Sequence, residues 1–167
     1  MSHLRDIRSG TRIFVDTNIF ALYFSHPGDL GKACRDFFVR TTSRELQGFT
    51  SASVAAETIH RVMVAEAAAM LSLSSQATVE HLQKHPSTVQ KLTRHLQVAS
   101  DMHRLGINIL PLTYKELHSS KNFRFQFGLL TNDSLILAVM QAHKLQHLAT
   151  HDAGFNRVRS VQVWGLA

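Results

Sequence analysis

The strongest constraint on the fold is an alternation of short β-rich runs with longer helical stretches. Strands that alternate with helices predict parallel βαβ units, because a parallel connection needs a crossover that a helix usually supplies. We therefore expect an α/β fold with a mostly parallel sheet of about five strands and helices on both faces. The expected strands are residues 12–15, 48–51, 107–110, 147–150 and 161–164.

The stretches between these runs carry apolar residues at helical spacing. Residues 26–29 contain Pro and Gly and predict a break, and residues 121–125 (KNFRF) predict a basic aromatic loop. A longer helical region at 81–105 should break near His85-Pro86. The remaining helices are expected at about 19–24, 30–44, 52–71, 113–119 and 134–142.

The length of 167 residues fits one domain with a real core, and no change of composition marks a second. The predicted domain spans residues 1–167, with residues 1–11 flexible and 72–105 forming a helical insertion. No apolar run is long enough to span a bilayer, and the charged first ten residues do not resemble a secretory signal, so we expect no membrane association. Cys34 is the single cysteine, which fits a buried small side chain in a cytoplasmic protein.

Four acidic residues stand where this fold would bring them together. Asp16 and Asp152 directly follow expected strands, and Glu57 and Asp133 lie early in expected helices. In such sheets these positions meet beyond the carboxyl ends of the strands, where ligands bind. Three of the four also have ordinary structural explanations: Asp16 as a helix cap, Asp133 in a first helical turn and Asp152 in a turn.

Glu57 is the hardest of the four to explain by structure alone. It stands in an apolar run, no capping box includes it, and Arg61 is its one cationic neighbour on the same helix. If all four carboxylates converge, each pair repels by about 1 kcal/mol or more even at a high effective dielectric. A hard divalent cation is the usual way to balance such a cluster, and it indicates phosphate chemistry.

The overall charge points to a polyanionic partner. Eighteen Lys and Arg residues stand against twelve acidic ones, and four of those twelve belong to the predicted cluster. The net charge of +6 therefore underestimates how basic the remaining surface is. The eleven histidines are scattered and form no zinc motif, so they do not predict a zinc site.

The four acidic segments resemble the motifs of PIN-domain ribonucleases, and among these most closely the VapC-type toxins of toxin–antitoxin modules. The similar segments are IFVDTN at 13–18, Glu57 in its apolar run, LTNDS at 130–134 and LATHD at 148–152. The resemblance runs from about residue 12 to residue 164. It implies a three-layer α/β/α fold and a Mg²⁺- or Mn²⁺-dependent endoribonuclease that cuts tRNA or rRNA. It also implies a homodimer and inhibition by a cognate antitoxin.

Carried over by motif position, the resemblance makes Asp16, Glu57, Asp133 and Asp152 the metal-binding and catalytic acids. It gives supporting polar roles to Thr17, Asn18 and Thr150, and it places the 72–105 insertion beside the groove. This chain has Gly154 and Asn156 where many relatives carry further acids. That difference should weaken a second metal position, which favours a one-metal mechanism over a two-metal one and leaves both open.

Basic and aromatic residues near the predicted groove are the expected RNA contacts. Phe123 and Phe125 are candidates for base stacking, although aromatic residues in such positions often belong to a core. Two other functions are compatible with a fold of this class. An aspartyl-nucleophile phosphohydrolase would need an acid where Asn18 stands, and a catalytically silent RNA-binding or scaffold module would not need all four acids. The basic candidates are Arg61, Lys121, Arg124, Arg157 and Arg159.

Overall fold

A computed structural model describes residues 2–25 and 28–166, and it has the predicted α/β architecture. All strands lie in one parallel sheet with the order β1-β6-β5-β2-β3-β4. The sheet contains the five expected strands and a sixth short one at the N-terminus. The strands are β1 (Ser2–His3), β2 (Arg12–Val15), β3 (Gln47–Ser51), β4 (Ile107–Leu110), β5 (His147–Ala149) and β6 (Gln162–Gly165).

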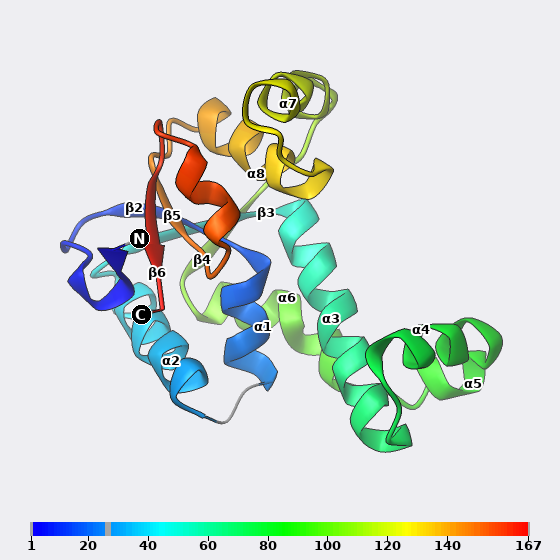
Figure 1. The fold of residues 1–167 in the computed structure, drawn as a ribbon. Helices are drawn as coiled ribbons and strands as arrows, with labels where there is room; N and C mark the ends of the chain where they lie inside the picture. Colours follow the sequence, from blue (N-terminus) through cyan, green and yellow to red (C-terminus); the bar gives the residue numbers. More distant parts are fainter. Residues whose placement is uncertain (1, 26–27, 167) are drawn as a thin grey trace.

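The helices form layers on the two faces of the sheet (Figure 1). α1, α2, α3 and α6 cover one face, and α7 and α8 cover the other, as right-handed crossovers require for this strand order. The break predicted at His26 and Pro27 lies outside the described residues. The α-helices are α1 (Thr17–Ser25), α2 (Asp29–Thr42), α3 (Ala52–Leu71), α4 (Ser75–Lys84), α5 (Pro86–Val89), α6 (Val98–Arg104), α7 (Tyr114–Phe127) and α8 (Thr131–Ala142).

The core lies between these layers. Ile13, Phe14 and Val15 of β2 are fully buried, as expected for a central strand covered on both faces. Cys34 is also buried, which raises the pKa of its thiol to about 12 and keeps it in the inert thiol form. No single described helix is long and apolar enough to cross a bilayer, and α3 and α4 pass such a test only as a pair bent by 94°.

The loop predicted at residues 121–125 is wrong, because this segment is the second half of α7. Thr113 caps that helix and forms a capping box with Glu116, and Phe123 and Phe127 stack on each other against the core. Packing of these aromatic rings therefore makes the segment helical, although its polar composition predicts a loop. Gly128 ends α7 with φ +61°, a left-handed conformation that glycine adopts without strain, and leads directly into α8.

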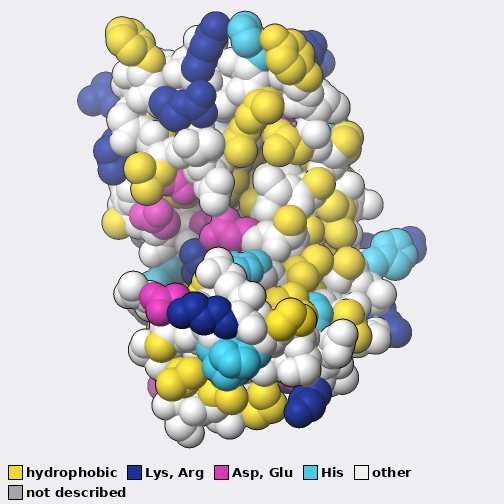
Figure 2. Space-filling view, turned by 90° about the vertical axis from the view of Figure 1, so that its right-hand side faces the viewer, with side chains coloured by type: hydrophobic (Ala, Val, Ile, Leu, Met, Phe, Trp, Pro, Cys, Tyr) yellow, Lys and Arg dark blue, Asp and Glu magenta, His cyan; other side chains and the backbone are white. Residues whose placement is uncertain are grey.

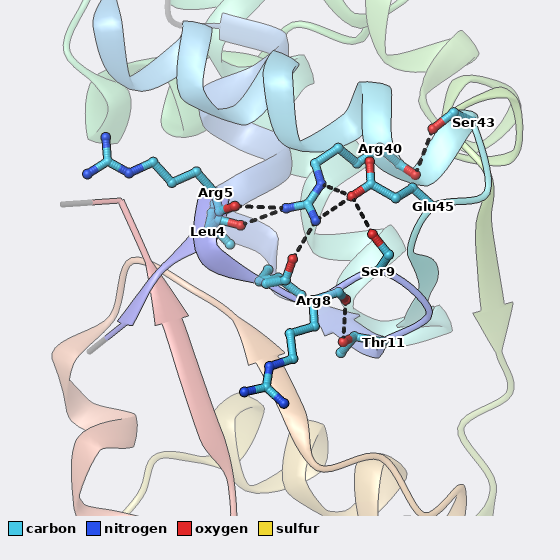
Figure 3. A network of polar contacts seen from close by, with 9 residues as sticks. Leu4, Arg5, Arg8, Ser9, Thr11, Arg40, Ser43 and Glu45 are labelled. Carbon is cyan, nitrogen blue, oxygen red and sulfur yellow. Dashed lines mark hydrogen bonds and ion pairs between the residues drawn. The ribbon is translucent and has the colours of Figure 1, made fainter.

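The N-terminal segment differs from the flexible tail expected at residues 1–11. β1 pairs with β6, the 3-10 helix η1 (Leu4–Asp6) follows it, and Leu4 and Ile7 are buried. Arg40 of α2 holds this segment through its guanidinium group (Figure 3). It donates to the backbone carbonyls of Leu4, Arg5 and Ile7 and pairs with Glu45 at 2.6 Å.

The predicted insertion at residues 72–105 consists of several helical pieces. α4 and α5 project from the far end of α3 in Figure 1, while η2 (Arg94–Gln97) and α6 lead back to β4. Ser72 ends α3 in a left-handed conformation, and the Ser74 side chain caps α4 by accepting from the Ala77 amide. These two serines make the sharp turn between the helices.

We predict that Arg40→Ala releases the N-terminal segment. Three backbone carbonyls and the Glu45 carboxylate each lose a donor, so the free energy of unfolding should fall by about 2 kcal/mol or more in urea titrations. Backbone amides of residues 4–7 should also exchange faster with deuterium. Arg5→Ala is the matched control, because that side chain is 78% exposed and should change stability little. Unchanged amide protection in Arg40→Ala would contradict the role given to Arg40.

Candidate functional site

The four predicted acids line one pocket at the carboxyl edge of the sheet. Asp16 follows β2, Glu57 lies on the second turn of α3, Asp133 is in the first turn of α8, and Asp152 precedes the 3-10 helix η3 (Ala153–Arg157). The pocket has a volume of about 540 Å³. Figure 2 shows acidic side chains gathered near the middle of this face, with Lys and Arg side chains above them over α7.

Asp16 is the most buried of the four acids, and its side chain is fixed on both oxygens. The Thr17 amide donates to Oδ1 at 2.6 Å, while Asn18 Nδ2 and the Thr150 hydroxyl each donate to Oδ2 at 2.7 Å. Asn18 and Thr150 thus contact Asp16 through their side chains and Thr17 through its backbone amide, while the supporting roles of these residues at a metal stay a prediction. None of the donors carries a charge, so the carboxylate is hydrogen-bonded but not neutralised.

The electrostatics of Asp16 follow from that arrangement. Burial raises its pKa to about 6; the hydrogen bonds from Thr150 and Thr17 oppose this shift, and the carboxylates of Asp133 and Glu57 add to it. The pKa of Asp133 is also raised, first by burial and then by Asp152 and Glu57. The acids therefore lie close enough to repel one another.

Glu57 has its own cationic partner. Arg61, four residues later on α3, donates from Nε and Nη2 to Oε1 at 3.1 and 2.9 Å. Asn132 donates to the other oxygen, Oε2, at 3.2 Å. Arg61 is the local partner predicted from the sequence, whereas Asn132 was not predicted as a site residue, although it stands next to Asp133 in the LTNDS segment.

Asp152 stands at the exposed rim of the pocket as the cap of η3. Its Oδ1 accepts from the Gly154 amide at 2.7 Å, and its own amide donates to the Thr150 hydroxyl at 3.0 Å. The Thr150 hydroxyl thus joins Asp16, Asn18 and Asp152. Glycine at 154 fits this turn closely, because a Cβ there would lie 3.0 Å from Asp152 Oδ1.

The Lys and Arg residues predicted to contact RNA differ in where they lie and in what they bind. Only Arg61 lines the acidic pocket. Arg124 donates to the hydroxyls of Ser120 and Ser134, and Arg157 donates to the carbonyls of Gly154 and Phe127, so both hold neighbouring segments together. Lys121 and Arg159 are exposed and do not line the pocket.

The two aromatic residues predicted to stack on RNA bases differ in how exposed they are. Phe123 is partly buried and packs against the core, so its ring is not free for a base. The side chain of Phe125 is 95% exposed on the outer face of α7.

Comparison with known proteins identifies the family. The model of the PIN domain matches residues 13–161, which is most of the chain. The chain belongs to the PIN-domain family. No sequence among curated proteins matches it.

Solved structures share the fold of this PIN domain. The VapC20 toxin of Mycobacterium tuberculosis, described as cleaving the sarcin–ricin loop, matches with a TM-score of 0.58 at 13% identity over 88% of this chain and 95% of that one. The VapBC2 complex of Rickettsia felis, bound to promoter DNA, gives a TM-score of 0.57 at 16% identity over 94% and 100%. A toxin–antitoxin complex from Klebsiella pneumoniae gives 0.51 at 21% identity over 90% and 95%.

The residues of this PIN-domain pocket fit a divalent cation in chemistry and charge. All four acids offer oxygen donors, which hard cations prefer, and the pKa values of Asp16 and Asp133 are raised first by burial and then by neighbouring carboxylates, a cost that a cation would relieve. The hydroxyl of Thr17 is buried in the same place without a hydrogen-bond partner. Within residues 2–25 and 28–166, however, no three His, Cys, Asp or Glu side chains are arranged as a ready ligand set. In this arrangement Arg61 and Asn132 hydrogen-bond to the two oxygens of Glu57, so an ion that used Glu57 would compete with them.

We predict that Asp16→Asn stabilises the metal-free protein at neutral pH. Because the folded-state pKa of Asp16, about 6, lies above its ordinary value of 3.8, the folded protein loses stability as pH rises between these values. Removing the charge should raise the free energy of unfolding in EDTA at pH 7.5 by about 1–3 kcal/mol.

The gain should disappear at pH 4, where the wild-type carboxyl is largely protonated in the folded state. Urea titrations at both pH values measure it. Asp36→Asn, whose side chain is 64% exposed, is the control and should change little. An equal gain at both pH values would show that burial of the Asp16 charge is not its cause.

Proposed function

We propose that this PIN domain is a metal-dependent endoribonuclease that hydrolyses RNA phosphodiester bonds. The observation that carries the proposal is the convergence of Asp16, Glu57, Asp133 and Asp152, from four separate segments, on one pocket with unbalanced negative charge. Membership of the PIN-domain family supports it. We further propose that the chain is the toxin of a type II toxin–antitoxin pair, acts on tRNA or rRNA, forms a homodimer and is inhibited by a cognate antitoxin. The fold shared with VapC20 and the VapBC2 complex supports this second step.

In this proposal Asp16 and Asp133 hold a Mg²⁺ or Mn²⁺ ion, with Asp152 and Glu57 completing the site. Such an ion acidifies water and stabilises negative charge on phosphoryl oxygens. Thr150 and Asn18 keep the Asp16 carboxylate in one orientation, which removes the entropy cost of ordering it. Asp152 is the proton acceptor: its Oδ1 is held by the Gly154 amide, and the side chain stands at the rim where water enters.

Asp16→Asn should reduce RNA cleavage by about a hundredfold or more, because the most buried acid of the site is lost. Cleavage is followed with end-labelled RNA in Mg²⁺ or Mn²⁺, and EDTA should abolish it in the wild type. Asp36→Asn should cleave normally. Wild-type rates in the purified Asp16→Asn protein would disprove the assignment.

The same variant also tests the ion without reference to activity. Added Mn²⁺ should raise the melting temperature of the wild type more than that of Asp16→Asn, because the ion binds the folded site. If Mn²⁺ stabilises neither protein and the wild type cuts no RNA, the pocket belongs to a catalytically silent module.

Arg61→Ala should weaken RNA binding and reduce its dependence on salt. Arg61 is the basic residue that lines the acidic pocket, so its loss should lower the slope of log affinity against log salt by about one phosphate contact. Fluorescence anisotropy in EDTA measures binding without cleavage. Arg104→Ala is the matched control, because Arg104 pairs with Asp101 on its own helix much as Arg61 pairs with Glu57. Equal slopes for all three proteins would exclude a phosphate contact by Arg61.

A further inference from the structure

A second hollow adjoins the acidic pocket on the side of the 72–105 insertion. It lies between α1, α3 and α4, has a volume of about 490 Å³, and shares Arg61 with the acidic pocket. The bend of 94° between α3 and α4 creates it, because α4 turns away from α3 instead of continuing its axis. We call this hollow the α3–α4 cleft.

The lining of the α3–α4 cleft suits a flat, partly polar ring. Ala65 of α3 and Val79 of α4 contribute small aliphatic surfaces, while His60 and Gln76 contribute hydrogen-bonding groups. None of the described residues that line it is acidic. Its volume falls in the range of about 300–1,000 Å³ that is usual for small-ligand pockets.

We propose that the α3–α4 cleft binds one unpaired base of the RNA, next to the phosphodiester in the acidic pocket. This inference rests on the proposed function. RNA cleaved in the acidic pocket must place its flanking nucleotides on the adjoining surface, and the α3–α4 cleft shares Arg61 with that pocket. Single-stranded RNA is read through bases that are splayed out of the strand and hydrogen-bonded on their edges. The insertion then determines which nucleotide stands beside the scissile bond.

Arg61 stands at the junction of the two hollows. Its side chain is 53% exposed, and its guanidinium is held by Glu57 on the same helix. A guanidinium in this place attracts the phosphate that links the base in the cleft to the nucleotide in the acidic pocket. The cleft has a cation at one end and no acidic residue among its described lining, so its charges suit the phosphate and base of RNA.

The test fills the cleft without touching the acids. In Ala65→Phe the added ring occupies the space of the base, and Ala69→Phe, one turn further along α3 at an exposed position that does not line the cleft, is the matched control. His60→Ala and Gln76→Ala remove polar groups and keep the cleft open, so they remain informative if Ala65→Phe fails to fold. Melting temperatures establish folding for every variant.

Two substrates separate the cleft from the acidic pocket. Bis(4-nitrophenyl) phosphate is a small phosphodiester that needs only the acidic pocket, whereas an RNA oligonucleotide needs both hollows. Ala65→Phe should raise the KM for RNA about tenfold or more and flatten the preference for the nucleotide beside the cut. Hydrolysis of bis(4-nitrophenyl) phosphate should stay unchanged, and Ala69→Phe should behave as the wild type with both substrates.

Nucleotide binding provides a readout that does not depend on cleavage. The four nucleoside 5′-monophosphates should show saturation-transfer signals with the wild type, one more strongly than the others, and Ala65→Phe should lose that difference. Unchanged RNA kinetics together with unchanged nucleotide signals in Ala65→Phe would overturn the proposal and leave the cleft to a protein segment. A wild type that hydrolyses neither phosphodiester would instead defeat the proposed function, while the nucleotide signals would still decide the cleft.

Discussion

The pocket depends on one hydroxyl group. Thr150, at the end of β5, donates to Asp16 Oδ2 and accepts from the Asn18 side chain and the Asp152 amide. It can do so because β5 pairs in parallel with β2, with Ala149 beside Val15. A slip of one residue in that register would turn Thr150 to the other face of the sheet. The register of two central strands therefore sets the geometry of three site residues at once.

Charge is distributed unevenly within that geometry. Glu57 has Arg61 as a direct partner, whereas Asp16 has only neutral donors and carries the larger energetic cost. The pKa values of Asp16, after β2, and Asp133, in α8, are raised first by burial and then by neighbouring carboxylates, so keeping both groups charged costs free energy. A cation would therefore bind more favourably there than beside Glu57, where a guanidinium already provides positive charge. This asymmetry agrees with a one-metal mechanism more readily than with a symmetric pair of ions.

Much of the fold was predictable because it depends on local pattern. The strands at 12–15 and 107–110 and the helix at 52–71 have the predicted bounds, since apolar residues at the spacing of one secondary structure mark each of them. The segment at 121–125 was not predictable from local polarity, because the stacking of Phe123 on Phe127 is what extends α7. Nor was the ordered N-terminus, which depends on Arg40 reaching carbonyls more than thirty residues away.

The convergence of the acids followed from topology, but the Asn132–Glu57 contact joins side chains 75 residues apart and has no sequence signal.

The basic composition also takes on a different meaning once individual contacts are known. Several guanidinium groups are already hydrogen-bonded to backbone carbonyls, hydroxyls or a local carboxylate, namely those of Arg40, Arg124 and Arg157. The net charge therefore overstates the number of Lys and Arg side chains that can bind a polyanion. Arg61, which lines the acidic pocket, matters more for that reason. Its Nε and Nη2 both donate to Glu57 Oε1, so a phosphate that recruits this guanidinium competes with Glu57 for the same donors. In the proposed nuclease, binding of the RNA backbone would then free a Glu57 oxygen toward the pocket and would couple RNA binding to completion of the acidic site.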